Sequence, residues 1–226
     1  MPAISRKLRI PAKRWHRVEP LQERSRETAD RFAAAAEDLL RDRSFEEISI
    51  QDIVRRAGRP TGSFYARFAS KEALLPFIYL RYHEDLERVF AARMERVDWA
   101  ALDFRGAVAT LIDVLVAMYL DQRWLIRAIS LFARAHPEAL PGDLIERRRR
   151  VYEPAIKALA LHRSRIGHDD PETAIRTGIF MVSSVAREKL LFGDAPLSRI
   201  TPISPKALRV ELARMLFSYL SPESRR

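Results

Sequence analysis

Hydrophobic residues recur at helical spacing along most of the chain. In residues 21–41 they fall on one helix face, occupied by Ala29, Phe32, Ala33, Ala36, Leu39 and Leu40. The same spacing predicts a short helix between Ser49 and Gly58, and further helices at 61–68, 71–94, 104–120, 123–135, 143–161, 171–192 and 205–220. We therefore predict an all-α fold.

Capping residues mark several of these boundaries. Ser49, with Asp52 three residues later, forms a capping-box pattern, and Gly58 ends the helix that follows. Two later helices begin with an N-cap residue and then a proline, which is favoured at the first helical position, in Asp170-Pro171 and Ser204-Pro205.

Two prolines fall inside predicted helices. Proline lacks the backbone N–H, so in a helix interior it removes a hydrogen bond. We expect Pro76 to kink the helix that begins at Lys71, and Pro154 to kink or divide its helix. If that helix joins two parts of the chain, Pro76 is a candidate hinge between them.

The first 20 residues show no helical periodicity and are strongly basic, since six cations precede the first acidic residue, Glu19: Arg6, Lys7, Arg9, Lys13, Arg14 and Arg17. We expect a flexible arm, and two interpretations stay open: contact with DNA phosphates or the minor groove, or a mobile extension without function. The predicted division of the chain is therefore an arm at 1–20, a head at 21–70 and a larger helical domain at 71–226.

Composition limits the class of protein. Of 226 residues, 47% are hydrophobic, which supports a substantial core, and the net charge of +10 favours a polyanionic partner such as nucleic acid. The absence of cysteine excludes thiolate chemistry and disulfides, and no apolar run has the roughly 18 residues of a membrane helix. We expect a cytoplasmic protein without a membrane partner.

Enzyme signatures are missing from the sequence. It contains no HExxH motif, no P-loop and no dinucleotide fingerprint, and Gly58 and Gly62 lie between predicted helices rather than after a strand. His136 has no second ligand at a metal-binding spacing. We therefore predict no enzymatic activity, no cofactor and no metal site.

Two short helices joined by a glycine turn, in residues 49–68, form the pattern of a helix-turn-helix, whose second helix enters the DNA major groove. Spacing alone is only suggestive, because many α proteins contain such pairs. The residues are more specific: ISIQDIVRRAG at 48–58 is followed by TGSFYARFASKEAL at 61–74. Together with Ala33–Ala36, this stretch closely resembles the signature of the TetR family of transcriptional regulators.

The resemblance implies a sequence-specific regulator, with repression of a palindromic operator that a small-molecule effector relieves. In the head, Gly62 would allow close approach to DNA, Tyr65 would contact a phosphate, and Lys71, in the first turn of its helix, would bind another. Two departures from the family pattern, Arg59-Pro60 and Arg67, place cations near the DNA, and leave Thr61 to cap the second helix. The full set of predicted DNA contacts is Ser49, Gln51, Arg59, Thr61, Gly62, Ser63, Tyr65, Arg67 and Lys71.

For the larger domain, the resemblance implies a homodimer formed by the last two long helices, 171–192 and 205–220. Their apolar stripes give the predicted interface: Ile175, Ile179, Val182, Leu208, Leu212, Met215 and Tyr219. A small, largely apolar effector would lie in a pocket drawn from Met118, Tyr119, Trp124, Arg127, Phe132, Tyr152 and Met181. For any one of these residues, ordinary core packing is an open alternative.

Two further interpretations concern the basic run at 146–150 and an alternative function. The run at 146–150, Glu-Arg-Arg-Arg-Arg, is predicted to be a solvated helix face rather than a second DNA site. A DNA-binding architectural or interaction protein without a small ligand is the alternative function. It would show little sequence preference and no stabilisation by metabolites.

Overall fold

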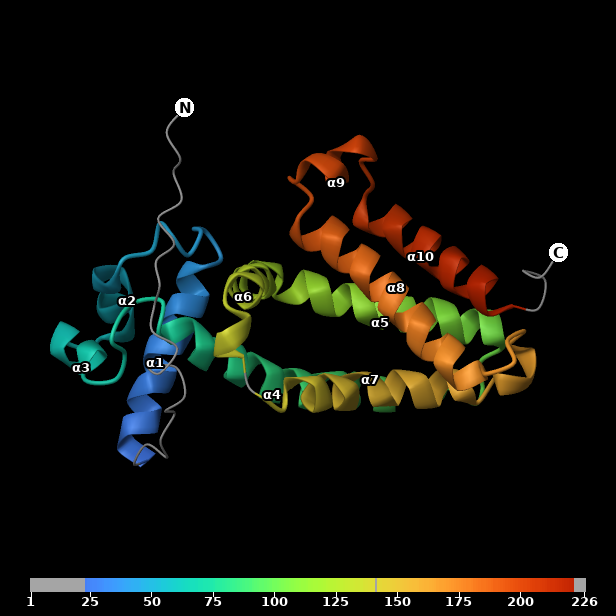
Figure 1. Ribbon diagram of the computed structural model, residues 1–226, viewed down its shortest axis with the longest axis horizontal. Coiled ribbons are helices and arrows are strands. Elements are labelled where there is room, and N and C mark those ends of the chain that lie inside the picture. The colour runs from blue at the N-terminus through green and yellow to red at the C-terminus, as the bar shows by residue number, and fades with distance from the viewer. Residues whose placement is uncertain (1–22, 141, 222–226) are drawn as a thin grey trace. The chain divides into compact units, whose positions relative to one another are not determined.

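The computed structural model describes residues 23–140 and 142–221 (Figure 1). Within these residues it contains helices and no strands, which confirms the all-α fold. The helices are α1 (Glu23–Leu39), α2 (Ile50–Ala57), α3 (Thr61–Tyr65), α4 (Leu74–Glu95), α5 (Phe104–Asp121), α6 (Arg123–Ala135), α7 (Leu144–Ala160), α8 (Pro171–Leu191), α9 (Pro196–Ile200) and α10 (Pro205–Leu220), with short 3-10 turns at η2 (Pro137–Ala139) and η3 (Arg163–Arg165). The predicted basic arm lies outside the described residues.

The described chain forms two compact units. The first contains residues 23–81 and 128–142, and the second contains residues 82–127 and 143–221. The first unit therefore continues past the predicted boundary at residue 70 and includes a segment from the second half of the sequence.

An aromatic cluster holds the first unit together. Phe32 of α1 and Phe64 of α3 are fully buried, with ring centroids 5.3 Å apart in an edge-to-face arrangement. The Phe68 ring lies 5.3 Å from Phe64 and 5.9 Å from Phe77. Phe64 and Phe68 therefore both point into the core of the first unit. Edge-to-face ring contacts of this kind stabilise a core by more than the burial of apolar area alone.

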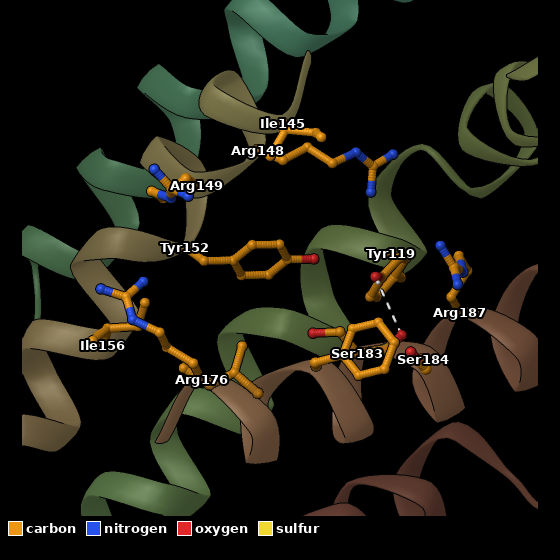
Figure 2. Close-up of a pocket in the computed structure, with 12 residues that line it drawn as sticks. Tyr119, Ile145, Arg148, Arg149, Tyr152, Ile156, Arg176, Ser183, Ser184 and Arg187 are labelled. Carbon is orange, nitrogen blue, oxygen red and sulfur yellow. Dashed lines mark hydrogen bonds between the residues drawn. The ribbon is translucent and has the colours of Figure 1, made fainter. Parts of the chain in front are cut away.

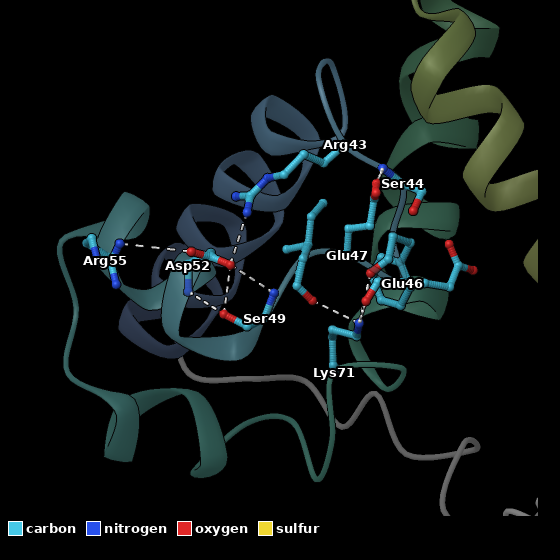
Figure 3. A network of polar contacts seen from close by, with 10 residues as sticks. Arg43, Ser44, Glu46, Glu47, Ser49, Asp52, Arg55 and Lys71 are labelled. Atoms are coloured by element: carbon cyan, nitrogen blue, oxygen red, sulfur yellow. Dashed lines mark hydrogen bonds and ion pairs between the residues drawn. The ribbon is translucent and has the colours of Figure 1, made fainter.

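The ends of α2 have the predicted chemistry (Figure 3). The Asp52 N–H donates to Ser49 Oγ at 3.1 Å, and the Ser49 N–H donates back to Asp52 Oδ2 at 3.0 Å, which completes the capping box. Gly58 ends the helix at φ +61°, in the left-handed region that glycine adopts without strain. The Arg59 N–H then reaches back to the Val54 carbonyl at 3.0 Å, and this Schellman-type closure turns the chain toward α3.

Of the two predictions about interior prolines, the one for Pro76 needs correction. Because α4 begins at Leu74, Pro76 occupies its first turn, where the N–H has no intrahelical acceptor in any case, so the expected kink has no cause there. Pro154 lies inside α7, which continues as one helix through it and is not divided.

In the second unit, α8 and α10 run antiparallel and pack on α5, while α7 packs on α5 and α8 (Figure 1). The predicted caps are confirmed: Asp170 accepts from the N–H groups of Glu172 and Thr173, and Ser204 Oγ accepts from Ala207. Gly178 lets α8 approach α10 closely, since a Cβ there would lie 2.6 Å from Leu216 Cδ1.

Candidate DNA-binding head and effector cavity

The outer surface of α3 carries small and polar side chains that face away from the aromatic cluster. Tyr65 is 56% exposed, although its ring touches that of Phe64 edge to face at 5.9 Å. Gly62 is exposed, and a Cβ added there would meet no atom of the protein within 4 Å. The fold of this chain therefore does not require glycine at this position.

Ser49 and Gln51 lie at the start of α2. The Ser49 hydroxyl is committed to the cap, since it accepts from the Asp52 N–H and donates to Asp52 Oδ2 at 2.7 Å. These hydrogen bonds with Ser49 lower the pKa of Asp52, with a smaller effect from Arg43. Gln51 is exposed on the same helix.

The segment before α3 differs from the prediction at one point. Pro60 precedes α3 and no side chain caps this helix, so the expectation that Thr61 would act as the cap is wrong. Arg59 is half-buried, and its Nε atom has no hydrogen-bond partner among the described residues. Arg67 Nη1 donates to the Ser63 carbonyl at 2.9 Å, which ties part of its guanidinium back to α3.

Lys71 holds the loop between α1 and α2 (Figure 3). Its ammonium donates to the carbonyls of Phe45 and Ile48 at 2.8 Å and of Glu46 at 3.3 Å, and it lies 4.7 Å from the centre of the Phe45 ring. The prediction that Lys71 occupies the first turn of its helix is wrong, because α4 starts three residues later. With three donors directed at three carbonyls, the side chain has a structural role in this geometry.

Replacing Lys71 with methionine is expected to lower the free energy of unfolding by about 1–3 kcal/mol, because the loop carbonyls lose their shared donor. Thermal denaturation measures this change. Arg55→Met is the matched control, since the Arg55 side chain is 79% exposed and should contribute little to stability. If Lys71→Met were as stable as the control but bound DNA less well, the phosphate role predicted from the sequence would replace the structural one.

A cavity of about 310 Å³ lies in the second unit between α5, α7 and α8 (Figure 2). Its lining is Tyr119, Ile145, Arg148, Arg149, Tyr152, Ile156, Arg176, Ile179, Phe180, Ser183, Ser184 and Arg187. Of the predicted pocket residues, Tyr119 and Tyr152 line this cavity. Sequence reasoning missed the arginines and serines, although one signal was present: Arg176, Phe180, Ser183 and Arg187 follow the spacing of a single helix face.

The other predicted pocket residues have different surroundings and do not line this cavity. Met118 packs against the core of the second unit, while Trp124 and Met181 are half-buried. Arg127 forms a two-pronged ion pair with Asp194, at 2.7 and 2.9 Å, and also donates to the Leu191 carbonyl. Phe132 is buried in the first unit, where its ring lies 5.2 Å from that of His136.

The run at 146–150 is largely the solvated helix face that the sequence predicts, since all of its residues except Arg147 are exposed. Arg147 pairs with Asp143 and Glu84, and Arg150 pairs with Glu87. Arg148 and Arg149 line the cavity. Some arginines of the run therefore form ion pairs with α4, and others line the cavity.

Most of the predicted dimer interface is buried within a single copy of the chain. Five of its side chains are at most 3% exposed, and they pack in the core of the second unit: Ile175, Ile179, Val182, Leu208 and Leu212. A side chain without accessible surface cannot form an interface, so this prediction is corrected for these five. Met215 and Tyr219 are half-buried.

His83 of α4 is a buried titratable group in the second unit. Burial, with a smaller effect from the charges of Arg148 and Arg147, lowers its pKa from 6.5 to about 3. The folded protein therefore keeps His83 neutral, whereas the unfolded chain binds a proton there below about pH 6.5. Above about pH 6.5 the protonation of His83 therefore does not reduce the free energy of unfolding. As the pH falls from 6.5 toward 3, the free energy of unfolding decreases, because the unfolded chain binds a proton that the folded protein does not.

At pH 5 we expect His83 to lower the free energy of unfolding by about 2 kcal/mol relative to pH 7, at 1.36 kcal/mol per pKa unit. Denaturation of wild type and His83→Leu at both pH values measures the difference. The variant should lose less stability between the two. Parallel losses in the two proteins would contradict the assigned protonation state.

Together, the capped α2, the glycine turn and the exposed α3 form a helix-turn-helix, so the first unit defines a helix-turn-helix DNA-binding protein. The family model described as "Bacterial regulatory proteins, tetR family" matches residues 33–76. The DNA-binding head of this chain is therefore similar to that of the TetR family.

Two curated regulators are also similar to parts of this chain. The HTH-type transcriptional regulator YwcC of Bacillus subtilis (strain 168) is 28% identical over 109 residues, which cover 46% of this chain and 48% of YwcC. A second B. subtilis regulator, YvdT, is 39% identical over 49 residues, which cover 22% of this chain and 25% of YvdT. The chain thus aligns with about half, or less, of these curated relatives.

The crystal structure of a putative TetR-family transcriptional regulator from Mesorhizobium loti MAFF303099 aligns with a TM-score of 0.59. The alignment covers 88% of this chain and 97% of that chain at 16% identity, so the two proteins share a fold.

Two kinds of feature are absent from residues 23–140 and 142–221. None of their helices is both long and apolar enough to cross a membrane. They also contain no group of three or more His, Cys, Asp or Glu side chains placed to hold a metal ion.

Proposed function

We propose that this protein is a DNA-binding transcriptional regulator of the TetR family, and that it represses from a palindromic operator as a homodimer until a small-molecule effector releases it. The observation that carries the proposal is the outer surface of α3. A side chain at position 62 would meet no other atom of the protein, so the fold does not explain why glycine stands there. Close approach of DNA to α3 would explain it. A role on DNA would place the protein in the cytoplasm.

The contacts proposed on DNA follow from exposure and chemistry. Tyr65 presents a hydroxyl that can donate to a phosphate, and Gln51, Thr61 and Ser63 add polar groups from α2 and α3. Arg59 carries a guanidinium, the group that donates to a guanine edge or a phosphate, but its Nε is buried, so a DNA contact would use the terminal nitrogens. Ser49 and Lys71 are left out of this set, because their polar groups already bind within the protein.

The homodimer is proposed by analogy with the family, with two recognition helices about 34–36 Å apart on successive major grooves. Because the predicted stripes are internal, the interface would use the exposed side of α8 and α10. Their exposed apolar side chains are Phe180, Val185 and Val210.

The cavity in the second unit is the proposed effector site, since it is the right size for a small molecule and lies within a unit separate from the head. An effector releases the operator only if it binds more tightly to the conformation that does not fit DNA.

Footprinting on the DNA upstream of the gene tests the proposal. We expect a protected region made of two half-sites about one helical turn apart, bound by two copies of the chain. Tyr65→Ala should weaken the protection. Absence of any protected site, or uniform protection along the fragment, would support the architectural alternative instead.

A further inference from the structure

The wall of the cavity is cationic. Four of its twelve lining residues are arginines, Arg148 and Arg149 from α7 and Arg176 and Arg187 from α8, and none of the described lining residues is acidic (Figure 2). Cations gathered around a small, partly enclosed space repel one another where neither a carboxylate nor a bound anion neutralises them. The lining thus favours a negatively charged occupant.

The four arginines differ in their partners. Arg149 pairs with Glu146 at 3.0 Å, and Arg176 pairs with Glu172 at 2.7 Å and Glu153 at 3.7 Å. For Arg187, no carboxylate of the described residues lies within ion-pair distance. Arg187 is close enough to Tyr119 to influence the pKa of its hydroxyl, and Figure 2 shows the two side chains at the same end of the cavity.

Ser183 supplies an independent indication that the cavity binds a polar group. Its side chain is buried, yet its Oγ has no hydrogen-bond partner among the described residues, which is unusual for a buried hydroxyl. Beside it, the Tyr119 hydroxyl donates to the Ser183 carbonyl at 3.3 Å, and burial raises the pKa of Tyr119 so that this hydroxyl keeps its proton. Polar groups that donate hydrogen bonds therefore meet near Arg187.

We propose that the cavity binds an organic oxyanion, a carboxylate or a phosphate ester with an apolar body. Arg187 and the Ser183 hydroxyl would bind the charged group, and Arg148 would add positive charge from α7. Ile156, Ile179 and Phe180 would contact the apolar body. This differs from the largely apolar effector expected from the sequence, and it rests on the proposed function in taking this cavity as the effector site.

Isothermal titration calorimetry of the full chain without DNA tests the inference. The probes are octanoate and octyl phosphate, with octanamide as the uncharged match and inorganic phosphate as the headgroup alone. We expect at least one of the two amphipathic anions to bind, and octanamide and inorganic phosphate each to bind at least about tenfold more weakly.

Variants separate a ligand contact from a structural role. Arg187→Gln should weaken binding of the anion at least about tenfold, because a charge-assisted hydrogen bond is lost. Ser183→Ala should weaken it about fivefold while leaving the melting temperature equal or higher, because the hydroxyl has no partner in the free protein. Arg150→Gln is the control: Arg150 is also on α7, pairs with Glu87 at 3.4 Å and does not line the cavity.

Four results would overturn the inference: no binding of either amphipathic anion at millimolar concentration, equal binding of octanamide, equal binding of inorganic phosphate, or unchanged affinity in Arg187→Gln. Because the titration contains no DNA, its outcome is independent of operator binding. If the anion bound but the protein recognised no operator, the cavity would still be an anion-binding site. Only the proposed function would then be contradicted.

Discussion

Replacing Phe64 with alanine is expected to lower the free energy of unfolding by about 3–5 kcal/mol, the usual effect of deleting a buried aromatic ring. Phe64 is fully buried, and its ring lies 5.3 Å from those of both Phe32 and Phe68. The deletion removes the contact by which α3 is held on α1. Denaturation monitored by circular dichroism measures the loss.

The neighbouring residue supplies the control for this experiment. Tyr65→Ala removes an aromatic ring from the same short helix, but from its exposed side, and should change stability by no more than about 1 kcal/mol. A similar loss in the two variants would mean that α3 is not anchored through Phe64.

Replacing Gly62 with leucine is expected to weaken operator binding at least about thirtyfold, because a bulky side chain would hold α3 away from the DNA and remove contacts worth about 1–3 kcal/mol each. The same change should leave the free energy of unfolding equal or higher, since the added Cβ meets open space and leucine favours a helix more than glycine does. Fluorescence anisotropy with labelled operator measures the affinity.

Ala34→Leu is the matched control, because Ala34 is also an exposed helical position of the first unit but lies on α1. It should leave operator affinity unchanged. If Gly62→Leu bound DNA as tightly as this control, α3 would not be the helix that approaches the DNA.

The elements set by local chemistry could be predicted from the sequence. The hydroxyl and carboxylate caps at Ser49, Asp170 and Ser204 form the expected hydrogen bonds, and Gly58 takes the left-handed conformation that its position required. Each of these depends on residues within about five positions along the chain, so no knowledge of the tertiary structure is needed.

Features set by long-range packing could not be predicted. The apolar stripes that include Ile175 and Leu212 suit either a dimer partner or a core, and packing on α5 decides for the core. Gly178, on the stripe of α8, was a sequence signal of close helix packing, and only the structure shows that the neighbouring helix is α10 of the same chain. Lys71 illustrates the same limit, since the carbonyls that it binds belong to residues 45, 46 and 48, more than 20 positions earlier.

The lining of the cavity could not be predicted either, because it too is set by long-range packing. Arg148 and Arg149 stand in a run of four arginines that look equivalent in the sequence. Only the position of α7 in the second unit distinguishes the arginines that line the cavity from Arg147 and Arg150, which are neutralised by carboxylates of α4.

The proposed function depends on recognition of a specific DNA sequence by the first unit. Its most direct test is the dissociation constant for the intergenic DNA upstream of the gene against scrambled DNA of equal length, measured at several salt concentrations for wild type and Gly62→Leu. We predict tighter binding of the upstream DNA by wild type at every salt concentration, and loss of that preference in the variant. Equal and steeply salt-dependent binding of both fragments by wild type would show phosphate attraction alone and would contradict the proposed function.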